Sequence, residues 1–207
     1  MLGAILHGMI LSFGLILPLG PQNIFLFNQG AAHSKVKFAL PAVITASLCD
    51  TLLIVLAVLG VSVIVMTIPA FQLIFFAIGF FFLIYIGWSI WHSSTSEVNK
   101  KHTAMTGKKQ AMFAISVSIL NPHAVLDTVG VIGTSSIRYT AIQEKIAFAS
   151  ACILVSWVSF FALVYIGKTI RSIDKEGKIV RMINKVSAIM IWGVSIFIGY
   201  QLYKIIF

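Results

Sequence analysis

The sequence predicts an all-α membrane protein of about six transmembrane helices. Hydrophobic residues make up 59% of the 207 residues and charged residues only 10%, and the mean hydropathy is +1.00. A soluble domain carries about 25% charged residues. The charges are also unevenly placed, because none precedes Lys35, none lies between Asp50 and Glu97, and none lies between Lys145 and Lys168. Apolar stretches of about 20 residues, enough to cross a bilayer core, therefore recur along the chain.

Six apolar segments are expected to be helical, because a backbone within hydrocarbon must satisfy its hydrogen bonds internally. These segments cover about residues 2–27, 38–66, 71–91, 111–133, 146–167 and 186–206.

Basic residues divide the connections between these segments into two sets. The loops after the first, third and fifth segments hold twelve Lys and Arg residues, whereas the other side holds only Arg138, Lys145 and Lys204. The positive-inside rule places the lysine-rich loops in the cytoplasm, so both termini are expected outside. The net charge of +9 is then a signal of membrane topology, and no nucleic-acid partner is expected.

The polar stretch of residues 93–110 is the one candidate linker, and we expect it to be cytoplasmic. It divides a single transmembrane domain, residues 1–207, into halves of about 1–92 and 111–207. Each half contains three helices, and because three is odd, the two halves are expected to be inverted repeats.

The first helix of each half is broken by proline. Proline removes a backbone donor and clashes with the preceding turn, so carbonyl groups near each break lose their partners. A tolerated kink is the simple explanation of one such proline. Paired interruptions in equivalent helices, however, are the best sequence indication of a transporter's binding site. The candidate residues at the two breaks are Gly20, Pro21, Gln22, Asn23, Asn121, Pro122 and His123.

Two carboxylates, Asp50 and Asp127, also lie in apolar surroundings. An ionised Asp near the membrane centre costs about 2.5–3.5 kcal/mol, so such a group indicates a cavity, an ion path or a counter-charge for substrate. A carboxylate hydrogen-bonded to a neighbouring helix is the alternative. His123 and Asp127 are four residues apart and share a helix face. Carboxylates in such surroundings can exchange a proton for a cationic substrate.

The other histidines and the cysteines are expected to have no role in the site. His33, His92 and His102 fall in loops or at membrane edges, where we expect them to be solvated. Cys49 and Cys152 are expected to be free buried thiols. No zinc-binding spacing is present, and we expect neither a metal site nor a cofactor.

Two long motifs carry a family resemblance. Pro18-Leu-Gly-Pro-Gln-Asn-Ile-Phe-Leu-Phe-Asn-Gln-Gly30 and Leu120-Asn-Pro-His-Ala-Val-Leu-Asp-Thr128 closely resemble the lysine/arginine exporter family (LysE/ArgO type). The resemblance implies a bacterial plasma-membrane secondary transporter that expels basic amino acids in exchange for a proton or another cation. A homo-oligomer is compatible with it. The resemblance also implies that the site is built from Gly20, Pro21, Gln22, Asn23, Asp50, Asn121, Pro122 and Asp127.

One position departs from the pattern, because Val125 stands where arginine-exporting relatives carry a tyrosine. Export of another small solute, either a neutral amino acid or a divalent metal ion, is therefore the alternative. A membrane enzyme that uses His123 and Asp127 is a weaker alternative, because the chain offers no credible nucleophile, and we expect no enzymatic activity. A structural protein would have no reason to bury two carboxylates beside broken helices.

Overall fold

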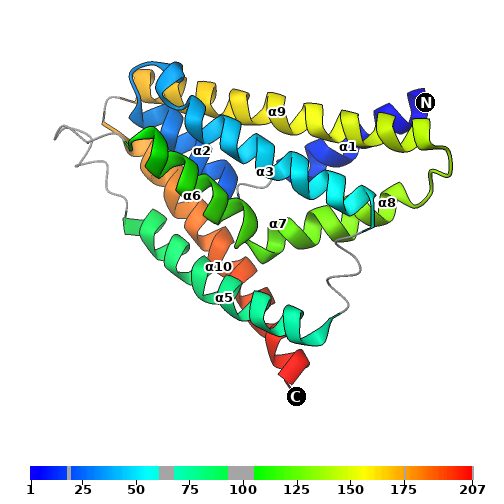
Figure 1. Cartoon of the computed structure of the whole chain (residues 1–207). Helices are drawn as coiled ribbons and strands as arrows, with labels where there is room; N and C mark the ends of the chain where they lie inside the picture. Colours follow the sequence, from blue (N-terminus) through cyan, green and yellow to red (C-terminus); the bar gives the residue numbers. More distant parts are fainter. Residues whose placement is uncertain (18–19, 61–67, 93–104, 175, 207) are drawn as a thin grey trace.

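The computed structural model describes residues 1–17, 20–60, 68–92, 105–174 and 176–206, and every regular element among them is helical. The elements are α1 (Leu2–Ile16), α2 (Pro21–Ala32), η1 (Val36–Phe38), α3 (Leu40–Val58), α5 (Pro69–His92), α6 (Gly107–Ile119), α7 (Pro122–Leu126), η3 (Asp127–Gly133), α8 (Thr134–Ser136), α9 (Ile142–Ile173) and α10 (Lys178–Ile206). The predicted all-α class is confirmed for this part of the chain (Figure 1).

Several helices have the length and the surface of membrane spans. Among the described residues, α3, α5, α9 and α10 are each long and apolar enough to cross a bilayer, and the count is six if each of two bent helix pairs is one span. Only 33% of the most apolar window of each of the four is buried inside the protein. Large side chains such as Leu48, Phe81 and Ile196 are 56%, 67% and 73% exposed. Surfaces this apolar suit lipid rather than water.

Several helix ends differ from the predicted bounds by a few residues, and two of the differences have a clear cause. α10 begins at Lys178 rather than near residue 186, because its basic first turns can lie outside the hydrocarbon and still form helix. α3 ends at Val58, because Gly60 takes a φ of 78° and its N–H donates to the carbonyl of Ala57. A glycine in this left-handed conformation closes a helix. The predicted extension of this segment to residue 66 and most of the 93–110 linker lie outside the described residues.

The helices of the two halves pack against each other reciprocally. α1 and α2 pack along α9, α3 packs along α6 and η3, and α5 pairs with α10. The broken helix of each half therefore lies against the unbroken second helix of the other half. Two inverted repeats are expected to pack in this way, but the two-fold axis that would relate the two halves stays a prediction.

Glycine allows α2 and α9 to approach closely. A Cβ atom on Gly30 would lie 2.0 Å from the carbonyl oxygen of Val164, and one on Gly167 would lie 2.1 Å from that of Phe27. No side chain fits at either position, so the two helices touch backbone to backbone. This contact fixes the second half of the first broken helix on the α9 surface.

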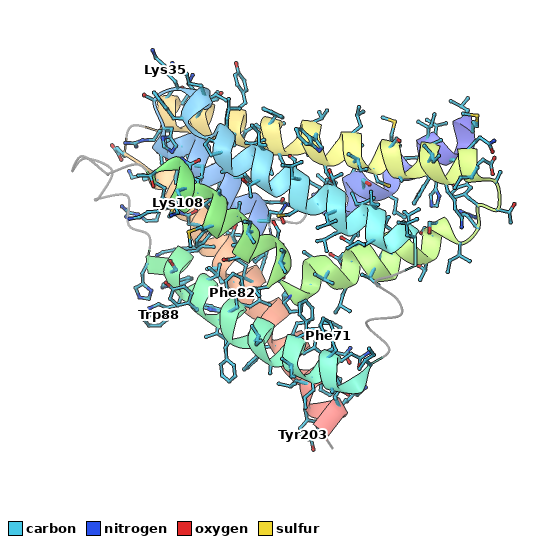
Figure 2. The ribbon with its side chains drawn as sticks, viewed as in Figure 1. Lys35, Phe71, Phe82, Trp88, Lys108 and Tyr203 are labelled. Atoms are coloured by element: carbon cyan, nitrogen blue, oxygen red, sulfur yellow. The ribbon has the colours of Figure 1, made fainter. Side chains whose placement is uncertain are left out.

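Basic residues from two separate parts of the chain lie at one end of the helices, here called the basic end. Figure 2 shows Lys35 and Lys108 at the end where α2 finishes and α6 begins. The chain termini lie away from this end (Figure 1), and the Met1 amino group is 3.3 Å from the Glu144 carboxylate.

A buried glutamine holds this basic end together. Gln110 is 1% exposed, and its Nε2 donates to the carbonyls of Phe38 and Met105, both at 2.9 Å. Its Oε1 accepts from the N–H of Ala42 at 3.3 Å. These bonds fix the amide orientation, and Nε2 also lies 3.0 Å from the Nε2 of His33. The predicted solvation of His33 is wrong, because this side chain is only 8% exposed, and burial lowers its pKa.

Candidate functional site

The first helix break turns the chain between α1 and α2. α1 ends at Ile16 and α2 begins at Pro21, with an angle of 76° between them. Proline suits the first position of a helix, where its missing N–H would have had no partner. Across the break, Asn23 Nδ2 donates to the carbonyl of Ile16 at 2.8 Å. This side chain therefore satisfies one of the carbonyls that the end of α1 leaves open.

The second break lies between α6 and α7. α6 ends at Ile119, Asn121 is extended, and α7 begins at Pro122 at an angle of 57°. The chain then continues into η3, a π-helix that starts at Asp127. π-helical insertions occur frequently at functional sites, because they re-aim the side chains on one face of a helix.

Both breaks border one cavity of about 150 Å³. Its polar wall residues come from α1, α2, α3, the second break, α7, η3 and α9, and are Ser12, Gln22, Asn23, Asp50, Asn121, His123, Asp127, Thr128 and Ser156. The apolar remainder includes Met190, Ile191 and Val194 from α10. A mainly apolar wall with a few convergent polar groups is typical of a small-molecule site.

Asp50 is held from across the cavity by α9. Ser156 Oγ donates to Asp50 Oδ2, and the neighbouring residues form a second link between the same helices. That link is a hydrogen bond of 3.1 Å from Trp157 Nε1 to Thr51 Oγ1. Ser156 therefore fixes one oxygen of Asp50, and a carboxylate held in this way can still accept hydrogen bonds from a cation.

The second acid is paired with a histidine on its own helix. His123 Nδ1 lies 2.9 Å from Asp127 Oδ2, as the four-residue spacing predicts. The two side chains are 40% and 31% exposed, and both line the cavity, so a ligand in the cavity could reach either one. Because a histidine can gain or lose a proton near neutral pH, the pair can change its net charge.

Two buried amide atoms on the cavity wall have no hydrogen-bond partner among the described residues. Gln22 is 8% exposed and Asn121 is 4% exposed, and the atoms concerned are Gln22 Nε2, a donor, and Asn121 Oδ1, an acceptor. Buried polar groups in proteins are nearly always hydrogen-bonded. These atoms are therefore suited to meet a polar ligand.

A comparison with models of protein families places this chain. Residues 13–202 match the model of the LysE type translocator. The chain belongs to the family of LysE type translocators. It is accordingly a multi-pass membrane transporter and not an enzyme, which confirms the family resemblance of the two motifs.

Curated relatives of this translocator match along nearly their whole length. The chain is 53% identical over 98% of its length to "Putative amino-acid transporter YisU" of Bacillus subtilis (strain 168), covering 91% of that protein. It is 30% identical to "Arginine exporter protein ArgO" of Serratia proteamaculans (strain 568), over 97% of this chain and 98% of the relative. The protein of the same name from Klebsiella pneumoniae (strain 342) is 31% identical, over 96% and 92%. No solved structure matches this chain.

The structure brings together eight of the nine residues that the sequence singles out. Gly20, Pro21, Gln22, Asn23, Asp50, Asn121, His123 and Asp127 all line the cavity. Pro122 does not, and its buried ring instead packs against α5, where a Cβ on Gly79 would lie 2.4 Å from Pro122 Cδ. The role of Pro122 in the translocator is therefore to shape the break rather than to line the cavity.

Sequence reasoning missed several wall residues of the translocator. Ser12, Thr128 and Ser156 are small polar residues within apolar helices, and all three are buried. Such residues commonly bond to the carbonyl four positions earlier, as Thr128 does to Ala124 at 2.8 Å, so their presence is a weak signal. Ser156 belongs to the site because it donates a hydrogen bond to Asp50, and the two residues are 106 positions apart. A local sequence pattern contains no sign of such a contact.

Proposed function

We propose that this translocator exports a cationic amino acid, arginine or lysine, across the bacterial plasma membrane. The observation that carries the proposal is the presence of two carboxylates, Asp50 and Asp127, on the wall of one cavity. Relatives that cover nearly the whole chain bear the name arginine exporter. We infer the direction of transport, outward, from these names and from the resemblance.

The charge argument concerns the cost of crossing hydrocarbon. An unpaired cation in the bilayer centre is unfavourable by about 2.5–3.5 kcal/mol or more, and an unpaired carboxylate costs a similar amount. Each therefore stabilises the other when a cationic side chain lies beside Asp50 or Asp127. Among the described acids, Glu144, Asp174 and Glu176 lie at or beyond helix ends, so these two are the acids available within the spans.

We infer that a proton is the coupling ion and that His123 and Asp127 carry it. A protonated His123 neutralises Asp127 across the 2.9 Å contact while the cavity holds no substrate. A cationic substrate competes with the imidazolium for the same carboxylate, so its arrival favours loss of the proton from His123. One charge thus replaces another, and the net charge of the occupied site stays constant.

We further propose that the basic end of the helices is cytoplasmic and that both termini lie outside. Charged loops of this kind are retained on the cytoplasmic side during insertion. The substrate would then enter from the end that carries Lys35 and Lys108 (Figure 2).

Transport into inside-out vesicles tests the proposal. Labelled arginine and lysine should accumulate when the vesicle lumen is acidic, and each should be displaced by the other but not by leucine or by a divalent cation. A pH-sensitive dye should report the counter-movement of protons. Accumulation of leucine or of a metal ion in place of both basic amino acids would contradict the proposed substrate.

A further inference from the structure

The N-terminal end of α2 borders the cavity, and no described side chain caps it. α2 has 12 residues, and the residue before it, Gly20, has no side chain to cap the helix. No acidic residue lies in its first turn. Gly20, Pro21 and Gln22 all line the cavity. The positive end of this helix dipole therefore faces a chamber that can hold a ligand, and such an end favours an anion.

The side chain of Gln22 points to the same conclusion independently. It is 8% exposed and lines the cavity, and its Nε2 meets no acceptor in the part of the chain that the structure describes. An amide N–H2 that is buried without an acceptor is unfavourable, and a carboxylate supplies the strongest acceptor available. The neighbouring Asn23 side chain is already used across the break, where it donates to the Ile16 carbonyl. Of the two α2 side-chain amides on the cavity wall, Gln22 is thus the one whose Nε2 remains for a ligand.

The second break offers a hydrogen-bond acceptor, whereas the first offers a donor. Asn121 is 4% exposed and lines the cavity, and no described residue donates to its Oδ1. A carbonyl oxygen of this kind accepts from an ammonium group. The cavity therefore presents a donor at the first break and an acceptor at the second, which together match the two charges of a zwitterion.

We propose that these groups form a subsite for the zwitterionic head group of a free α-amino acid. The α-carboxylate binds the N-terminal end of α2 and Gln22 Nε2, and the α-ammonium donates to Asn121 Oδ1. This inference rests on the proposed function, and it deepens it by dividing the cavity into two parts. Asp50 and Asp127 then remain for the cationic side chain, because they would repel a carboxylate.

The subsite makes the carboxylate a requirement for binding. Agmatine is arginine without its carboxylate, and cadaverine is lysine without its carboxylate, so both keep the cation and lose the anion. A site that recognised the cation alone would accept these amines as readily as the amino acids. The proposed subsite rejects them, because Gln22 Nε2 and the end of α2 would stay unpartnered.

Competition against labelled arginine, with the full chain reconstituted in liposomes, tests this directly. Unlabelled arginine should compete at least about tenfold better than agmatine, and lysine at least about tenfold better than cadaverine, as expected for a lost charged hydrogen bond. Equal competition by amine and amino acid would overturn the subsite and leave the proposed function standing. A third outcome separates the subsite from the proposed substrate. Isopentylamine is leucine without its carboxylate. If the protein binds leucine but rejects both arginine and isopentylamine, the head-group subsite stands and the proposed cationic substrate is wrong.

A variant pair then assigns the preference to Gln22. Gln22→Leu should weaken arginine binding by about tenfold or more and leave agmatine binding unchanged, so that the preference for the amino acid disappears. Gln29→Leu is the matched control, because Gln29 lies on the same helix, is 6% exposed and does not line the cavity. It should keep the wild-type preference. An unchanged preference in a folded Gln22→Leu protein, or its loss in both variants, would overturn the assignment.

Discussion

Replacing Asp50 by asparagine removes one negative charge from the cavity and leaves its shape almost unchanged. The carboxylate accepts a hydrogen bond from Ser156, and the carbonyl oxygen of an asparagine can accept the same bond. The separate link between Trp157 and Thr51 should also persist at 3.1 Å. We therefore expect Asp50→Asn to insert and fold normally, so that any change in transport reports the charge.

The size of the effect follows from the electrostatics of the cavity. A unit charge about 4 Å from its partner gains about 4 kcal/mol at an effective dielectric constant of about 20. Removing one partner of a close charged pair generally costs about 2–5 kcal/mol. Arginine affinity should thus fall at least about 30-fold, since about 1.4 kcal/mol corresponds to a factor of ten. A neutral amino acid gains nothing from the charge, so any residual competition by it should not weaken.

The assay is arginine export by proteoliposomes or inside-out vesicles at matched protein levels. Glu144→Gln provides the control, because it also removes one carboxylate, but one that is 39% exposed and paired with the Met1 amino group. Its export should stay within about twofold of wild type, since an exposed pair contributes about 0–1 kcal/mol. Wild-type arginine export by a correctly inserted Asp50→Asn protein would refute the counter-charge reasoning.

Three further predictions concern stability and topology. Gly30→Ala should destabilise the fold by about 3 kcal/mol or more, because its Cβ would meet a backbone oxygen at 2.0 Å, and should therefore lower the midpoint of thermal unfolding in detergent. Gly14→Ala places its Cβ in open space and should leave the midpoint unchanged; equal midpoints for the two variants would contradict the contact. Burial lowers the pKa of His33 below 6.5, the ordinary pKa of a histidine, so the stability of the fold should decrease as the pH drops below 6.5. His33→Gln should make this decrease smaller; parallel curves of stability against pH for the two proteins would contradict the prediction. Reporter fusions after Lys37 should score cytoplasmic and those after Phe207 external, and a cytoplasmic C-terminus would mean that the span count or the orientation is wrong.

Local chemistry explains why much of the site could be predicted from the sequence. A membrane span needs about 20 apolar residues, a proline breaks the helix in which it lies, and a carboxylate in hydrocarbon needs a reason to be there. Each of these rules depends on residues within a few positions of one another. They therefore located the two breaks at Pro21 and Pro122 and the two acids at Asp50 and Asp127 before any contact was known.

Only the tertiary structure decided which side chains meet and what each one is free to do. Asp50 and Ser156 are 106 positions apart, and His33 and Gln110 are 77 apart, so neither contact leaves a trace in local periodicity. The position of Pro122 also depends on a distant contact. Its sequence context resembles that of Pro21, but it packs against α5 instead of lining the cavity. Hydropathy specifies that a segment is helical and buried in the membrane, but helices of equal hydropathy can pack in many arrangements. The choice among them is made by close fits between distant surfaces, which exist only once the helices have assembled.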